Sequence, residues 1–129
     1  MKLLMQVLKK NDRLKIDNTT IASKELIAKI TEEYKEVIEA IQKYENNKRL
    51  INLKDIIRET YDLIQMCILV LWKCHRKALT LDEPNLIKEL NEEHIVKLID
   101  KRKWTAKANI DIELKEQEGL YSGTKEYNI

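Results

Sequence analysis

The sequence predicts an all-α protein, a helical bundle built on three main helices and a short N-terminal segment. The composition supports this fold class, because the 129 residues include two glycines, one proline and no phenylalanine, with 43% hydrophobic and 36% charged residues. Few turn residues and many charges are typical of long helices. Apolar residues also recur at helical spacing along most of the chain. A chain of this length has room for one domain with a single core.

The first helix is expected from about Ser23 to Tyr44, with Ser23 as a candidate N-cap. Its apolar residues recur every three or four positions and so form one stripe. They are Leu26, Ile27, Ile30, Tyr34, Val37, Ile38 and Ile41.

The second helix is expected from about Leu53 to Leu79, a stretch without Gly or Pro. From Leu63 onward it is apolar on nearly every side, so we expect it to lie in the middle of an assembly. Its most apolar run, residues 63–72, is about half as long as the roughly twenty residues that cross a bilayer. The sequence therefore predicts no membrane partner.

A third helix is expected after "LDEP", where Asp82 or Glu83 can cap it and Pro84 stands in its first turn. It should continue toward Trp104.

The two ends of the chain are expected to differ, with a short helix at the N-terminus and a tail at the C-terminus. Residues 1–17 are expected to form a short helix that packs on the bundle. Residues 1–104 are thus predicted to form a single helical domain, and residues 105–129 a C-terminal tail that a partner subunit or substrate orders.

Charge and cysteine content indicate the compartment and the class of partner. The 24 basic and 22 acidic residues leave a formal charge of +2, too small to indicate nucleic acid as a partner. The N-terminus lacks the small-residue cleavage site of a signal peptide. Cys67 and Cys74 lie seven residues apart on one helix, too far for a disulfide. We expect two buried thiols in a reducing cytoplasm.

Two pairs of acidic residues are candidates for a cation site. They are Glu33 with Glu36 and Glu59 with Asp62, each three positions apart. On a helix this spacing places both carboxylates on one face, where they can grip one cation. Five such pairs occur among the 22 acidic residues, against roughly four expected by chance. Position distinguishes Glu59 and Asp62, because they stand immediately before the helix becomes apolar. Desolvation and repulsion there favour a bound cation or a pairing Lys or Arg.

The two pairs can meet if their helices pack antiparallel through a short connection. Four carboxylates around a small space indicate Mg²⁺, a hard ion that takes oxygen ligands and commonly bridges carboxylates to phosphates.

The acidic residues also carry a family resemblance. "KITEEYKEVIEAI" contains Glu32, Glu33 and Glu36 as Glu-Glu-x-x-Glu, and "ETYDLI" contains Glu59 and Asp62 as Glu-x-x-Asp. This ordered pair of motifs resembles that of the MazG-type all-α nucleoside triphosphate pyrophosphohydrolases, over about residues 25–102.

A third motif of that family, on the following helix, supplies basic residues to the substrate phosphates. The segment "NEEHIVKLIDKR" offers Asn91 and Lys97 at matching positions. Either Lys97 alone, or Lys97 with Lys101 or Arg102 one turn further on, would contact the phosphates. Glu93 stands where the family commonly has Lys. This departure indicates a divergent branch, of the kind found in phages or prophages.

The resemblance implies a reaction. Mg²⁺, or Mn²⁺ in its place, would be held by Glu33, Glu36, Glu59 and Asp62, and Glu32 or Glu36 would orient or deprotonate the attacking water. A (deoxy)nucleoside triphosphate would give the monophosphate and pyrophosphate, as in house-cleaning of the nucleotide pool.

A bundle of three helices and a short first segment can barely enclose the apolar run at residues 63–72 of the second helix. We therefore expect a homodimer or a homotetramer that buries part of it. The alternative function is a non-enzymatic helical dimerisation or interaction protein whose acidic pairs are solvated faces.

Overall fold

The computed structural model describes residues 1–115, which divide between two compact units. Met1–Ile87 forms the first unit, and the second begins at Lys88. The described residues contain three α-helices and one two-stranded ribbon, so the predicted all-α class is confirmed. None of the described helices is both long enough and apolar enough to cross a membrane.

The predicted domain boundary at residue 104 stays a prediction. Residues 102–115 form neither helix nor strand, in agreement with the loss of periodicity in the sequence. The rest of the predicted C-terminal tail, residues 116–129, lies outside the described residues.

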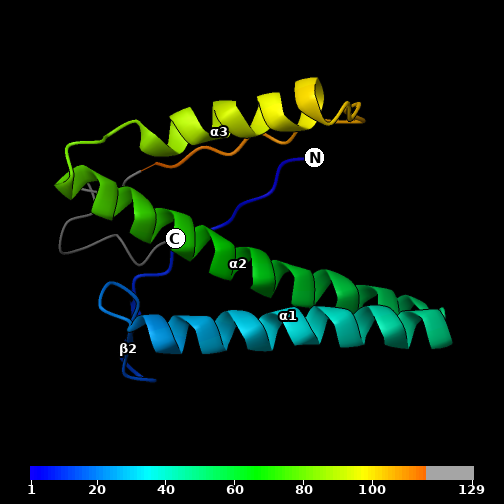
Figure 1. The fold of residues 1–129 in the computed structure, drawn as a ribbon. Helices are drawn as coiled ribbons and strands as arrows, with labels where there is room; N and C mark the ends of the chain where they lie inside the picture. Colours follow the sequence, from blue (N-terminus) through cyan, green and yellow to red (C-terminus); the bar gives the residue numbers. More distant parts are fainter. Residues whose placement is uncertain (116–129) are drawn as a thin grey trace. The chain divides into compact units, whose positions relative to one another are not determined.

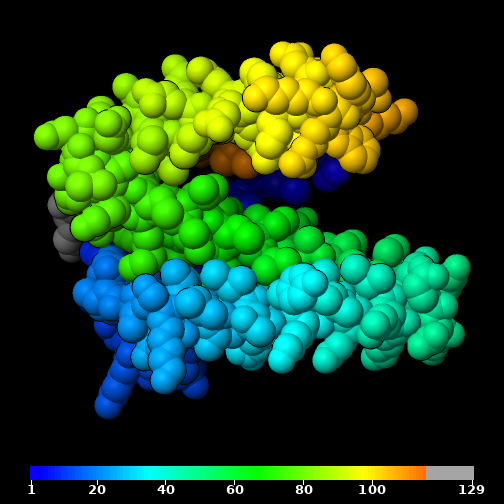
Figure 2. Space-filling view, viewed as in Figure 1, coloured from blue at the N-terminus to red at the C-terminus, as the bar shows by residue number. Residues whose placement is uncertain are grey.

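An antiparallel pair of long helices forms the first unit (Figure 1). Helix α1 comprises Ser23–Asn46 and helix α2 comprises Leu50–Thr80, within three residues of the predicted bounds at each end. The side chains of the two helices meet along the length of the pair (Figure 2). Because the connection is only residues 47–49, the chain must reverse at once, and the two acidic motifs run past each other.

A buried amide secures that connection. Asn52 is 4% exposed, and its side-chain N–H donates a 2.7 Å hydrogen bond to the carbonyl oxygen of Asn47. The backbone N–H of Asn47 in turn donates to the carbonyls of Lys43 and Tyr44, which ends α1. A side-chain bond to an otherwise unpaired carbonyl at a helix end satisfies the backbone where the chain turns.

The prediction of a short helix over residues 1–17 is wrong. This segment is extended and forms an antiparallel ribbon of β1 (Lys10–Asn11) and β2 (Ile16–Asp17). The carboxylate of Asp17 accepts hydrogen bonds from the backbone N–H and the hydroxyl of Thr19, at 2.8 and 2.6 Å. Such local side-chain bonds favour a turn over a helix at the end of this segment.

Two hydrogen bonds fasten the N-terminal segment to α2. The side-chain amide of Gln65 donates to the carbonyl of Gln6, and the ammonium group of Lys73 donates to the carbonyl of Asn18 at 3.3 Å. One flank of the C-terminal half of α2 is therefore covered by this segment.

Two helix starts differ from the predictions. Ser23 is the first residue of α1, and Ala22 occupies the N-cap position without a side-chain bond. Pro84 lies in a turn before α3 (Leu86–Val96) and not in its first turn. Helix α3 continues as a π-helix, η1 (Lys97–Lys101).

The prediction of two buried thiols is wrong in part. Cys67 and Cys74 are free, as expected, but both are exposed. Of the large apolar residues on α2, only Leu69 is buried in the described chain, at 3% exposure. The reason is that α1 and the N-terminal segment cover only part of the circumference of α2.

Candidate metal centre

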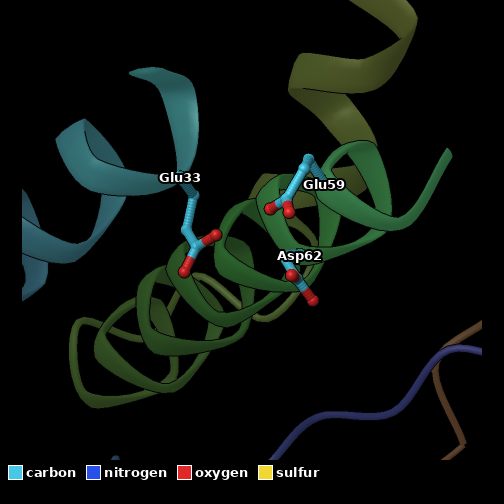
Figure 3. A group of neighbouring side chains, drawn as sticks. All are labelled: Glu33, Glu59 and Asp62. Carbon is cyan, nitrogen blue, oxygen red and sulfur yellow. The ribbon is translucent and has the colours of Figure 1, made fainter. Parts of the chain in front are cut away.

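Three carboxylates from the two long helices converge in the first unit. Glu33 extends from α1 toward Glu59 and Asp62 on α2 (Figure 3). One carboxylate oxygen from each lies within 4.8 Å of those of the other two. Glu59 and Asp62 are one helical turn apart, and the antiparallel packing sets Glu33 opposite them. The predicted juxtaposition of the two motifs thus occurs for these three residues.

No basic side chain of the described residues forms an ion pair with this cluster. Glu33 and Glu59 are half-buried and Asp62 is exposed. Atom Oε2 of Glu33 is buried and has no hydrogen-bond partner. The nearby guanidinium of Arg58 pairs with Asp55, at 3.0 Å from Nη1 to Oδ1, and so leaves the three carboxylates unpaired. A buried carboxylate oxygen without a partner costs free energy, which a cation would offset.

The pKa values of two of these carboxyls reflect the missing charge. Burial raises the pKa of Glu33 to about 7, with further contributions from the charges of Glu36 and Asp62. The pKa of Glu59 is raised first by a hydrogen bond with Glu36 and then by burial. Each shift means that the site favours added positive charge, whether from protons or from a metal ion.

Glu36 and Glu32 take different places beside the cluster. Glu36 is half-buried on α1 and interacts with both Glu33 and Glu59, although it is not among the three residues with converging ligand atoms. Glu32 is exposed. The structure therefore places the fourth predicted metal ligand next to the cluster, and the other candidate for water activation at its solvent side.

Asp55 belongs to this neighbourhood but to neither of the two acidic sequence motifs. It stands one turn before Glu59 on α2, and its charge contributes to the raised pKa of Glu59. The spacing of four residues from Glu59 is a signal that could have identified it.

The separation of the oxygens suits a small, hard cation. Mg²⁺ binds oxygen at about 2.0–2.1 Å in an octahedral arrangement, so oxygens opposite each other across the ion are about 4.2 Å apart. The observed limit of 4.8 Å requires only small side-chain movements to reach that geometry. Three carboxylates would leave coordination positions open for water or phosphate.

The predicted substrate-binding residues belong to the second unit. Asn91 lies on α3, Lys97 and Lys101 begin and end η1, and Arg102 follows, all exposed. The backbone N–H of Arg102 donates to the carbonyl of Lys97 at 3.0 Å. Lys97 lines a small surface pocket together with three residues of α3, Leu90, Glu93 and His94. The π-helical turn was not predicted, and no feature of the sequence indicates it.

In comparisons with known proteins, the chain matches no protein-family model, no curated protein and no solved structure. The resemblance to the MazG-type enzymes therefore rests on the sequence motifs alone.

Proposed function

We propose that the protein is a Mg²⁺-dependent pyrophosphohydrolase that converts a (deoxy)nucleoside triphosphate into the monophosphate and pyrophosphate, as part of nucleotide-pool house-cleaning. The convergence of Glu33, Glu59 and Asp62 without a balancing charge is the observation that carries this proposal. The motif resemblance supplies the substrate class. Mn²⁺ is expected to substitute for Mg²⁺, because it takes similar ligands.

The carboxylates divide into two roles in this proposal. Glu33, Glu59 and Asp62 hold the metal ion, with Glu36 as the fourth ligand. When bound, the ion neutralises charge on the triphosphate and links it to the protein. Glu32 or Glu36 accepts a proton from the attacking water, which makes the water a better nucleophile. Glu36 is half-buried and interacts with both Glu33 and Glu59, which favours it as a ligand and favours the exposed Glu32 for the water.

The basic residues of the second unit are the proposed contacts for the substrate phosphates. Lys97, Lys101 and Arg102 carry positive charges that suit phosphate oxygens, and the Asn91 amide can donate a hydrogen bond. All four are exposed and so are available to a substrate.

Assembly and location also remain proposals. We propose that the protein forms a homodimer or homotetramer and acts in the cytoplasm. We propose neither nucleic acid nor a membrane as its partner. The two free, exposed thiols suit a reducing compartment.

The test is a screen of the common and deoxy nucleoside triphosphates for pyrophosphate release, with Mg²⁺ and with EDTA. Release that requires Mg²⁺, and that Asp62→Asn lowers by two orders of magnitude or more, supports the proposal. Glu39→Gln is the matched control, because Glu39 is an exposed acidic residue of α1 on the side facing away from α2. Equal loss in both variants would count against a metal site at Asp62.

The alternative is a non-enzymatic helical interaction protein, favoured by the exposed apolar side chains of α1 and α2. The two functions separate in thermal melting with Mg²⁺ and a non-hydrolysable triphosphate. A ligand that binds only the folded state raises the midpoint. No rise at millimolar concentrations of both would favour the interaction protein.

A further inference from the structure

Trp104 presents an uncovered indole just after the π-helix of the second unit. It is 64% exposed, although tryptophan is highly buried on average in folded proteins. The other tryptophan differs, because Trp72 is half-buried and the guanidinium of Arg76 lies 4.9 Å from the centre of its ring. Within the described residues, no cation lies over the ring of Trp104. This ring is therefore available to a ligand.

The backbone around Trp104 is fixed even though the side chain is exposed. The N–H of Arg102 donates to the carbonyl of Lys97, and the N–H of Trp104 donates to the carbonyl of Leu98, both at 3.0 Å. Lys103 between them has a φ of 59°, a left-handed conformation that is unfavourable for a residue with a side chain. Single π-helical turns and left-handed residues other than glycine are frequent at ligand-binding sites. The turn keeps the backbone of Trp104 next to the end of η1.

The segment from residue 97 to residue 104 concentrates positive charge. It contains four basic residues and one acidic residue, Asp100, which gives a net formal charge of +3. The basic residues are all exposed, and none of them forms an ion pair within the described part of the chain. They are Lys97, Lys101, Arg102 and Lys103. Unpaired basic side chains of this kind suit phosphate oxygens, which carry charge and accept hydrogen bonds.

An indole beside unpaired cations fits a ligand that has two unlike parts. An apolar partner would cover the ring but would remove water from the charges without compensating them. An acidic peptide would pair with the charges but has no need of the ring. A nucleotide supplies both parts, because its base has a flat face that stacks on aromatic side chains and its phosphates bind Lys and Arg. The chemistry of this segment therefore selects a nucleotide.

We propose that Trp104 is a specificity-determining residue of the substrate site, where its indole stacks on the base of the nucleoside triphosphate while basic side chains of residues 97–103 contact the phosphates. The identity of the nucleotide as a substrate rests on the proposed function. Every base has a face that can stack, so this contact is tolerant of the base. Trp104 therefore favours nucleotides over inorganic polyphosphate without selecting one base.

Binding of non-hydrolysable nucleoside triphosphates in the presence of Mg²⁺ tests the stacking. In the full chain, Trp104→Ala should raise the Kd for analogues of each base about tenfold or more, which is about 1.4 kcal/mol and lies in the range for stacking of a base on an aromatic side chain. Trp104→Phe keeps a ring and should raise the Kd less. Inorganic triphosphate has no base, so its Kd should stay within about twofold of the wild-type value in both variants.

Two further variants separate stacking from charge and from exposed apolar surface. Lys97→Gln removes a cation and should weaken the binding of nucleotide and inorganic triphosphate by similar factors, since both ligands carry phosphates. Ile110→Ala is the matched control, because Ile110 is another apolar residue of the second unit, 86% exposed, and this variant should bind both ligands as the wild type does. If Trp104→Ala weakened both ligands equally, the stacking role would be overturned.

Fluorescence locates the base directly. In a Trp72→Phe background Trp104 is the only tryptophan of the chain. Stacking of a base on the indole should quench its emission as the nucleotide analogue is added, and inorganic triphosphate should leave the emission nearly unchanged. Emission that stays constant while calorimetry shows the nucleotide to be bound would place the base elsewhere and overturn the proposal.

Turnover separates the stacking role from the proposed function. If nucleotide binding depends on Trp104 as described but no pyrophosphate is released with Mg²⁺ or Mn²⁺, the proposed function fails and the nucleotide site stands. If the wild type releases pyrophosphate and Trp104→Ala leaves the KM within about twofold for every substrate, the proposed function stands and the stacking role is overturned. Absence of both nucleotide binding and turnover overturns both.

Discussion

Glu33 on α1 and Asp62 on α2 hold carboxylate oxygens within 4.8 Å of each other, and the charge of Asp62 raises the pKa of Glu33. Neither residue forms an ion pair in the described part of the chain. Like charges held this close by two packed helices destabilise the metal-free protein. The repulsion is therefore one that a bound proton or a cation would relieve, and it sets the signs of the predictions below.

Neutralising Asp62 or Glu59 should damage catalysis and spare the fold. Asp62→Asn and Glu59→Gln keep the side-chain shape but remove the charge that a cation requires, so pyrophosphate release should fall by about two orders of magnitude or more. Stability in EDTA should hold or rise by about 1 kcal/mol, because repulsion is relieved. Urea unfolding in EDTA, beside turnover per folded molecule, checks both parts.

The opposite result would mean that these carboxylates are structural. Breaking a buried ion pair costs roughly 3–5 kcal/mol, but the guanidinium of Arg58, the residue before Glu59, is already paired with Asp55. Glu45→Gln is the control, since it breaks only the exposed pair with Lys48 and should change stability by about 1 kcal/mol or less. A large loss of metal-free stability in Asp62→Asn with turnover retained would refute the metal-site hypothesis.

The metal-free protein should lose stability as the pH rises from about 4.5 to about 7. Glu33 has a folded-state pKa of about 7 against an ordinary value of 4.5. The folded state therefore holds its proton more tightly than the unfolded state does. The resulting stabilisation is complete below pH 4.5 and is lost as the pH passes 7. Its size is on the order of 1–3 kcal/mol.

Urea unfolding in EDTA between pH 4.5 and 8 measures this slope. Glu33→Gln should flatten the curve in that window, because the amide does not titrate. Millimolar Mn²⁺ should restore stability at pH 8 and have less effect at pH 5, where protons compete for the same oxygens. If the free energy of unfolding of the wild-type protein depended on pH as little as that of Glu33→Gln, the pKa of Glu33 would not be raised in the folded state.

The turn between the long helices should support the metal site from a distance. Asn52→Ala removes the buried amide that bonds the Asn47 carbonyl and should cost about 1–3 kcal/mol. The looser connection should also weaken Mn²⁺ binding, because Glu33 and Glu59 depend on the alignment of α1 and α2. Asn46→Ala, at an exposed position on the same end of α1, is the control and should change neither. Thermal melting and Mn²⁺ titration of both variants provide the measurement.

The sequence predicted the helices and their facing residues better than it predicted which side chains are buried. The periodicity of α1 and α2 is set by neighbours three and four residues away, so their bounds and the facing of Glu33 toward Glu59 followed from the pattern. Residues 1–17 were misjudged because leucines at helical spacing compete there with the turn-forming bonds of Asp17. The exposure of Cys67 could not be predicted either, since it depends on what covers α2, and an apolar stripe does not indicate which molecule covers it.

Glu32 and Glu36 can be distinguished by measuring metal binding and turnover together. Glu36 is half-buried and interacts with both Glu33 and Glu59, so Glu36→Gln should weaken Mn²⁺ binding at least tenfold and abolish pyrophosphate release with it. Glu32 is exposed at the edge of the cluster. If it deprotonates the water, Glu32→Gln should lower kcat by 10²–10⁴-fold, the usual contribution of a general base, while Mn²⁺ affinity and KM change little. Calorimetry with Mn²⁺ and steady-state kinetics on the same preparations provide both readouts, with Glu39→Gln as the control. Wild-type turnover in Glu32→Gln would assign the water to Glu36, and loss of Mn²⁺ binding in Glu32→Gln would make Glu32 a ligand instead.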